Sequence, residues 1–137
     1  MRSHEATYEA FINGKLGKDE WTHEAHLVTC WMALRTRTAA EALSHLRDSI
    51  QAHNCGIGIR NTAASGYHET LTVYYVTAID ALDASSPEEL FDAPEVSRTA
   101  PLHHWDKDRL MSPEARTGWL EPELAPLPWP VVHDLPA

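Results

Sequence analysis

The chain has 137 residues, 43% of them apolar, which is enough for one ordinary domain with one hydrophobic core. Lys and Arg number 11 against 20 Asp and Glu, so the formal net charge is -9, and the basic residues are scattered along the chain. A chain of this charge repels the phosphates of nucleic acids, and the sequence therefore argues against a nucleic-acid partner.

The sequence also points away from export and from membranes. The N-terminal stretch MRSHEATYEAF is charged and lacks the apolar region of a signal peptide, and no segment approaches the roughly 20 apolar residues of a membrane span. Cys30 and Cys55 lie far apart and form no CxxC pair, which favours reduced, structural thiols. We therefore expect a soluble, cytoplasmic protein without a membrane partner, and the sequence leaves a homodimer open.

Three helices are predicted in the first part of the chain. The first is short and amphipathic, with Ser3 as its N-cap, and it ends at Gly14, after which the polar turn GKLGKDE begins. The second follows the N-cap Thr22 and ends at the charged stretch RTRT, and the third covers about 39–53. Because the connection between the second and third helices is short, these two should be antiparallel neighbours.

A glycine-rich loop and a fourth helix are predicted next. Residues 54–66, NCGIGIRNTAASG, contain three Gly and interrupt the helical pattern. The stretch YHETLTVYYVTAIDAL contains strand-favouring Val, Tyr and Thr, but its 16 residues are long for a strand and its apolar residues fit a 3.6-residue period. We therefore predict a buried helix over 67–82.

Prolines mark the starts of short helices and an extended tail in the remainder of the chain. Ser86 as N-cap and Pro87 at the first helical position predict a short helix in SSPEELFD, and PLHHWDKDRL and SPEARTGW predict two more. Residues 121–137 carry five prolines and are predicted to form an extended tail packed on the helices of residues 1–120. The predicted fold is all-α, a small single-domain helical bundle with a Pro-rich extended C-terminal tail.

The nine histidines are more than a chain of this size usually carries, and two of them suggest a metal site. His23 and His26 lie three residues apart, so a helix presents both on one face, where they could bind one metal ion. The alternative is that both rings are solvated or bond locally in the first turn. His68 follows the glycine-rich loop and offers a third imidazole, and three protein nitrogens with one open position recur in catalytic metal sites.

The neighbours of these histidines suggest further chemistry. Zinc is the default metal for nitrogen ligands, and iron, nickel and copper also suit imidazole. Glu69 is predicted to act as a general base or to accept a hydrogen bond near the metal, with a solvated or capping carboxylate as the alternative, and Glu24 has the same two readings. Tyr67 could donate a proton or hydrogen bond near the metal, or pack at the helix entrance.

Three segments, THEAHLVTCWMAL, GYHETLTVYYV and ARTGWLEPELAPLP, occur in that order along the chain. Together they resemble a family of small uncharacterised bacterial helical proteins with THxxHLxxAW, YHETxT and VEPDLxPLP segments, over about residues 21–128. The resemblance implies no established activity. The residues that match motif positions are His23, His26, Tyr67, His68, Glu69 and Thr70. Histidines outside the segments include His4, His45, His53, His104 and His133, and Ala25 stands where the family often carries Asp.

Four further side chains are candidates for the same site. His103 and His104 could supply a ligand from a later helix, or be rings at the surface or core edge. Arg60 and Arg116 could bind a substrate carboxylate, or pair with acidic groups of the protein itself.

The function predicted from these residues is that of a small metal-dependent enzyme acting on a small molecule. Its mononuclear site would use His23, His26 and His68, with Glu69 handling protons and metal-bound water as nucleophile or base. The sequence leaves open whether the reaction is hydrolytic, lyase-type or oxidative. The alternative is a non-catalytic protein that binds a metal or a small ligand, and a third hypothesis is a structural or interaction protein whose histidines are incidental.

Overall fold

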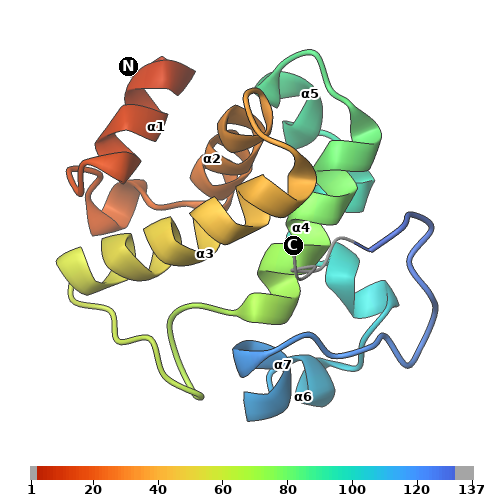
Figure 1. The fold of residues 1–137 in the computed structure, drawn as a ribbon. Coiled ribbons are helices and arrows are strands. Elements are labelled where there is room, and N and C mark those ends of the chain that lie inside the picture. Colours follow the sequence, from red (N-terminus) through yellow and green to blue (C-terminus); the bar gives the residue numbers. More distant parts are fainter. Residues whose placement is uncertain (1–2, 132–137) are drawn as a thin grey trace.

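The computed structural model describes residues 3–131 and shows an all-α fold (Figure 1). The α-helices are α1 (His4–Ile12), α2 (His23–Leu34), α3 (Ala39–Gly56), α4 (Glu69–Leu82), α5 (Pro87–Phe91), α6 (Lys107–Leu110) and α7 (Pro113–Thr117). Three short 3₁₀ helices complete the list: η1 (Lys18–Glu20), η2 (Pro94–Val96) and η3 (Ala100–His103). The described residues contain no strand, and the predicted fold class is confirmed.

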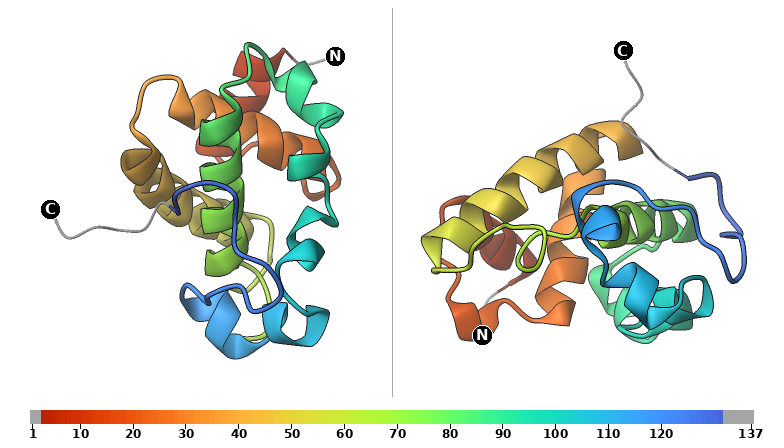
Figure 2. Two further views of the ribbon diagram at one scale, coloured as in Figure 1. Left: turned by 90° about the vertical axis from the view of Figure 1, so that its right-hand side faces the viewer. Right: turned by 90° about the horizontal axis from the view of Figure 1, so that it is seen from below.

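Helix α4 lies at the centre of the fold. Helices α2, α3 and α7 and the turn η2 pack against it, α1 covers α2 and α3, and α5 packs on α2 (Figures 1 and 2). The neighbours α2 and α3 are in contact, as the short connection between them predicted. None of the helices in the described part of the chain has the length and apolar character that crossing a membrane requires.

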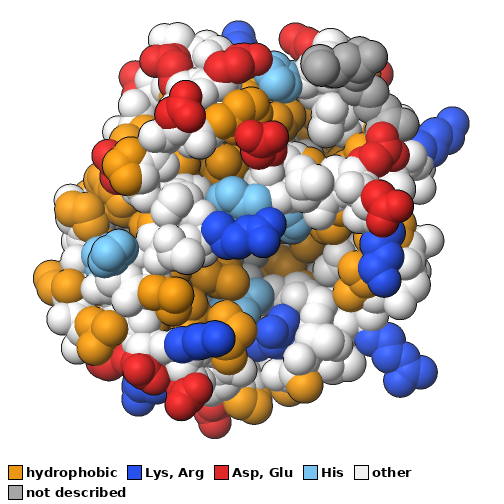
Figure 3. Space-filling model, turned by 180° about the vertical axis from the view of Figure 1, so that it is seen from behind, with side chains coloured by type: hydrophobic (Ala, Val, Ile, Leu, Met, Phe, Trp, Pro, Cys, Tyr) orange, Lys and Arg blue, Asp and Glu red, His pale blue; other side chains and the backbone are white. Residues whose placement is uncertain are grey.

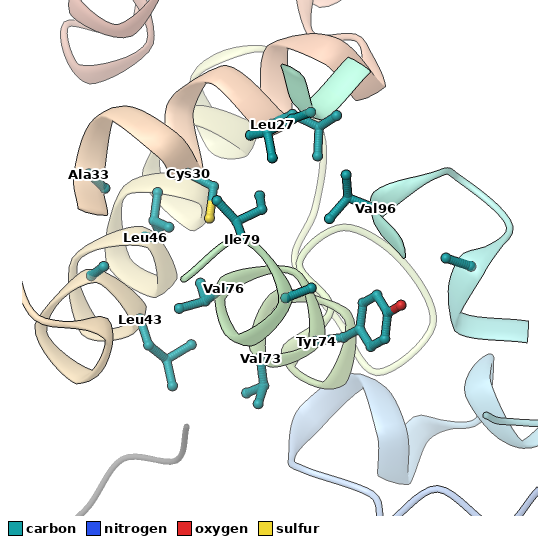
Figure 4. Close-up of a cluster of buried hydrophobic side chains, with 14 of the residues drawn as sticks. Leu27, Cys30, Ala33, Leu43, Leu46, Val73, Tyr74, Val76, Ile79 and Val96 are labelled. Atoms are coloured by element: carbon teal, nitrogen blue, oxygen red, sulfur yellow. The ribbon is translucent and has the colours of Figure 1, made fainter. Parts of the chain in front are cut away.

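The hydrophobic core lies between α2, α3 and α4 and extends to the turn η2 (Figure 4). The side chains that meet there are Leu27, Cys30 and Ala33 from α2, Leu43 and Leu46 from α3, Val73, Tyr74, Val76 and Ile79 from α4, and Val96 from η2. Helix α4 therefore contributes buried residues on more than one side, which explains why strand-favouring Val and Tyr are accommodated in a helix. The burial of these side chains outweighs the preference of Val and Tyr for strands.

The predicted helix starts are confirmed by their caps. The hydroxyl of Ser3 accepts a hydrogen bond from the Ala6 amide at 3.1 Å, and that of Thr22 accepts one from the Ala25 amide at 3.2 Å. Pro87 is the first residue of α5, as expected of proline at a helix start.

Three predicted boundaries were wrong. Helix α3 continues to Gly56 instead of ending near residue 53, so the loop begins at Ile57. Helix α4 begins at Glu69 because His68 serves as its N-cap. The predicted helix over PLHHWDKDRL is split into η3 and α6, because the side chain of Asp106 accepts a hydrogen bond from the amide of Asp108 and starts a new helix there.

The segment after α7 is an extended strap without helix or strand as far as residue 131, in agreement with its prolines. Figure 2 shows it passing along α4, and its half-buried Leu120, Leu127, Trp129 and Val131 pack against the core. The rest of the predicted tail, residues 132–137 with His133, lies outside the described residues.

Candidate functional site

A cavity of about 550 Å³ lies between α2, α3, α4 and the segment of residues 98–111. We call it the histidine cavity, because His23, His26 and His68 all line it together with Trp21, Tyr67, Tyr75, Arg98, Lys107 and mostly apolar side chains. From the side opposite to Figure 1, histidine and basic side chains gather around a hollow that contains hydrophobic atoms (Figure 3). The three histidines predicted to share a site therefore do meet at one cavity.

His23 is held by the backbone of η2. Its Nε2 donates a hydrogen bond to the carbonyl oxygen of Val96 at 2.9 Å, and its ring meets Tyr75 edge-on at 5.5 Å. The neighbouring carbonyls are held as well, because the hydroxyl of Tyr74 donates to the oxygen of Glu95 and that of Tyr75 to the oxygen of Ser97. Three consecutive carbonyls are thus fixed by side chains of α2 and α4.

His68 uses both of its ring nitrogens within the protein. Its Nδ1 accepts a hydrogen bond from the Leu71 amide at 3.1 Å and so caps α4. The ring proton must then lie on Nε2, which donates to the carbonyl oxygen of Leu110 at 2.6 Å. Burial lowers the pKa of His68, and the bond to Leu110 opposes this only in part, so the neutral tautomer is favoured.

His26 differs from both, because its ring makes no hydrogen bond within residues 3–131. The ring lies on the indole of Trp21, with the ring centroids 3.7 Å apart. Burial, and after it the positive charges of His23, His53 and Arg98, lower the pKa of His26 to about 4. At neutral pH the ring is therefore uncharged, and it presents a polar group to a mostly apolar cavity.

The predicted metal site needs three side chains whose ligand atoms converge on one ion. In the part of the chain that the structure describes, no three His, Cys, Asp or Glu side chains are arranged so that they could hold a metal ion. His23 and His26 each keep a ring nitrogen without a partner there, but both nitrogens of His68 are occupied. A three-histidine site for zinc, iron, nickel or copper would require His68 to give up its helix cap and its bond to Leu110, so this site stays a prediction.

Glu69 faces a different space. It lines a second hollow of about 590 Å³, the arginine cleft, together with Arg47, Gln51, Asn61, Tyr67 and Arg116. Its Oε1 accepts hydrogen bonds from Arg47 Nε at 2.9 Å and from the Tyr67 hydroxyl at 2.7 Å, and its Oε2 accepts one from Arg47 Nη2 at 2.5 Å. The histidine cavity includes Tyr67 in its wall but not Glu69, so the structure does not bring the predicted base to the histidines.

Tyr67 lies between the two hollows and is kept in its protonated form. Burial and then the hydrogen bond to Glu69 raise the pKa of its hydroxyl. The hydroxyl donates to Glu69, so its proton is directed toward the arginine cleft and not toward His26. The predicted donation of a proton near a metal stays a prediction.

The four other candidates are spread over the molecule. Arg116 lines the arginine cleft and donates from Nη1 to the carbonyl oxygen of Gly66 at 2.8 Å, while Arg60 is exposed and lines neither hollow. His103 is exposed, and His104 bonds through Nδ1 to the carbonyl oxygen of Ala125 in the strap. Neither ring lines the histidine cavity.

Several residues of the cavity were not found from the sequence. Trp21 directly precedes the N-cap Thr22, and an apolar residue at that position often packs against the first turns of the helix, which was a usable signal. Arg98 and Lys107 had no such signal, because only the path of residues 94–111 in space brings them to the cavity.

Comparison with models of protein families, with curated proteins and with solved structures finds no match to this chain. The function is therefore inferred from the geometry of the histidine cavity and the arginine cleft.

Proposed function

We propose that the protein binds a small organic molecule in the histidine cavity, where neutral His26 accepts a hydrogen bond from the ligand. Of the functions considered from the sequence, this is the non-catalytic small-ligand alternative. The observation that carries it is the uncharged His26 ring, which has no hydrogen-bond partner within residues 3–131 and lines a mostly apolar cavity.

The size and lining of the cavity support this proposal. Pockets for small ligands are typically about 300–1,000 Å³, mostly apolar, with a few polar groups that orient the ligand. The histidine cavity has about 550 Å³ and combines apolar side chains with His26 at its wall. His26 is half-buried and its ring makes no hydrogen bond within residues 3–131, so a ligand that donates a hydrogen bond to His26 finds an available acceptor at the cavity wall.

The pKa of His26 favours binding over proton transfer. A general base works best when its pKa lies near the working pH. With a pKa of about 4, His26 is a weak base at neutral pH but still a good hydrogen-bond acceptor. The metal-dependent enzyme remains the competing proposal, and the metal content of untagged protein, measured by plasma mass spectrometry, tests it.

The probe for the proposed function is N-phenyl-1-naphthylamine, whose fluorescence rises in apolar surroundings and whose amine N–H can donate to His26. We expect it to bind the wild-type protein. His26→Leu should weaken this binding by at least about fivefold, because an unpaired buried donor costs about 1–3 kcal/mol. Leu71→Trp, which fills part of the cavity without changing a charge, should weaken it as well.

The matched control is His103→Leu, the same substitution at an exposed position outside the cavity. It should leave the binding curve unchanged. Equal binding by all four proteins, or no binding to the wild type, would contradict the proposed function.

A further inference from the structure

Among the described residues, two basic side chains at the histidine cavity have no acidic partner. Arg98 and Lys107 both line the cavity and are exposed to solvent, and neither side chain makes an ion pair or hydrogen bond within residues 3–131. Arg47 and Arg109, in contrast, pair with Glu69 and Glu123.

The backbone that carries Arg98 is held in place by the cavity wall. The carbonyl oxygens of the three residues before it, Glu95, Val96 and Ser97, accept hydrogen bonds from Tyr74, His23 and Tyr75. Arg98 follows directly, and after burial, His23 and His53, its charge is among the causes that lower the pKa of His26. The guanidinium is thus positioned beside the same cavity that His26 lines.

Lys107 comes to the cavity from a later element of the same segment. It is the first residue of α6, whose last residue, Leu110, accepts the hydrogen bond from His68 Nε2. His23 and His68 therefore hold, through hydrogen bonds, the segment that carries Arg98 and Lys107 to the cavity.

Two cations beside an apolar cavity fit a ligand with two different ends. The apolar body would displace water from the cavity, which is favourable in proportion to the apolar area buried. An acidic group at the other end would meet Arg98 and Lys107, and hydrogen bonds between ionised groups are stronger than those between neutral ones. A fully apolar ligand would make no charge-assisted hydrogen bond with Arg98 or Lys107.

We propose that the ligand of the histidine cavity is an amphiphilic organic acid, whose anionic group binds Arg98 and Lys107 and whose largely apolar body enters the cavity with a hydroxyl or amine group that donates to His26. This inference rests on the proposed function and adds the chemical class of the ligand to it.

The test compares octanoate with 1-octanol, which share the chain length but differ in charge, as competitors that displace N-phenyl-1-naphthylamine. In the double variant Arg98→Gln/Lys107→Gln, we expect the affinity for octanoate to fall about tenfold relative to wild type, as the loss of charge-assisted bonds implies. The affinity for 1-octanol should stay the same. Raising the salt concentration should weaken octanoate binding to the wild type but not to the double variant, because salt screens exposed charges.

The control variant is Arg60→Gln, which removes one exposed cation that lines neither hollow, and it should bind octanoate like the wild type. If the double variant binds octanoate as well as the wild type does, while 1-octanol still displaces the probe, the acidic ligand class is overturned and the proposed cavity function stands. If octanoate does not displace the probe from the wild type, the acidic ligand class fails, and if the probe itself does not bind the wild type, both proposals fail.

Discussion

His23, His26 and His68 line one cavity, but the partners of their ring nitrogens differ. His23 and His68 each donate to a backbone carbonyl, of Val96 and Leu110, while His26 has no partner within residues 3–131 and rests on Trp21. The rings of His23 and His68 hold the segment that contains Val96 and Leu110, and the ring of His26 is left to interact with a molecule that enters the cavity.

The titration of His26 links this arrangement to stability. Its pKa is about 4 in the folded state, against 6.5 for the unperturbed side chain, so the unfolded chain takes up the proton first as pH falls. The stability due to neutral His26 is complete above about pH 6.5 and is lost as pH falls toward 4, by up to about 1.4 kcal/mol per pH unit. His68, whose pKa is also lowered, contributes in the same direction.

We therefore expect His26→Gln to flatten the dependence of unfolding free energy on pH between 6.5 and 4, as measured by urea unfolding at a series of pH values. His103→Gln, at an exposed site outside the cavity, is the control. A wild-type slope that persists in His26→Gln would show that other groups cause the acid sensitivity.

The sequence could predict that these histidines meet, but not how they are held. The i, i+3 spacing places His23 and His26 on one helix face, and His68 stands at the start of the next buried helix. The partner carbonyls lie 73 residues from His23 and 42 residues from His68, and no local pattern reveals a contact over such separations. For the same reason the prediction of a metal ligand at His68 did not include its bond to Leu110.

At the level of helices, side-chain caps and prolines were the informative signals. Ser3, Thr22 and Pro87 predicted helix starts that the structure confirms, because each acts locally. The two hydroxyls accept hydrogen bonds from amides three residues further on, and the ring of proline fixes its own backbone angle. His68 as the N-cap of α4 was missed, since histidine is not among the residues usually favoured there. The ends of helices depend more on tertiary packing, and α3 accordingly runs past its predicted end.

Glu69 connects two of these helices, because its carboxylate receives both Arg47 of α3 and the hydroxyl of Tyr67. Glu69→Gln keeps the size of the side chain but removes the charge that Arg47 pairs with. We expect it to lower the unfolding free energy by about 1–3 kcal/mol, the usual cost of leaving a partly buried polar group unsatisfied. Binding of N-phenyl-1-naphthylamine should be unchanged, because Glu69 lines the arginine cleft and not the histidine cavity.

A comparison with Arg47→Gln tests the cause. The two substitutions together should cost little more than either one alone, since both remove the same interaction. Loss of probe binding in Glu69→Gln without loss of stability would instead connect Glu69 with the cavity, as its predicted part in catalysis requires.

At the scale of the whole molecule, the extended strap after α7 connects the C-terminal part of the described chain with the rest of the fold. Backbone groups of the strap find partners in the turn between η3 and α6: Trp105 Nε1 donates to the oxygen of Leu120, and the Leu124 amide donates to the oxygen of His104. Trp105 is fully buried and meets Trp119 edge-on at 5.6 Å. The prolines predicted an extended conformation, but only the fold shows what the strap covers.

Thr70 makes the connection between α4 and the strap. Its hydroxyl donates to the carbonyl oxygen of Gly118 at 2.8 Å and accepts from the Leu120 amide at 3.1 Å, and the side chain is completely buried. Thr70→Val preserves the shape but leaves both backbone groups without this partner. We expect a loss of about 2–3 kcal/mol in unfolding free energy, from two buried groups left unsatisfied.

Thr70→Ser, which keeps the hydroxyl, should recover most of this loss, and Thr29→Val is the matched control. Thr29 is equally buried, but its hydroxyl bonds only within its own helix, to the oxygen of His26, so its replacement should cost less. Because the strap would be released first, limited proteolysis of Thr70→Val should cut between residues 118 and 131 under conditions in which the helices remain intact. Uniform cleavage along the chain, or equal losses in Thr70→Val and Thr29→Val, would show that Thr70 contributes ordinary core packing and does not anchor the strap.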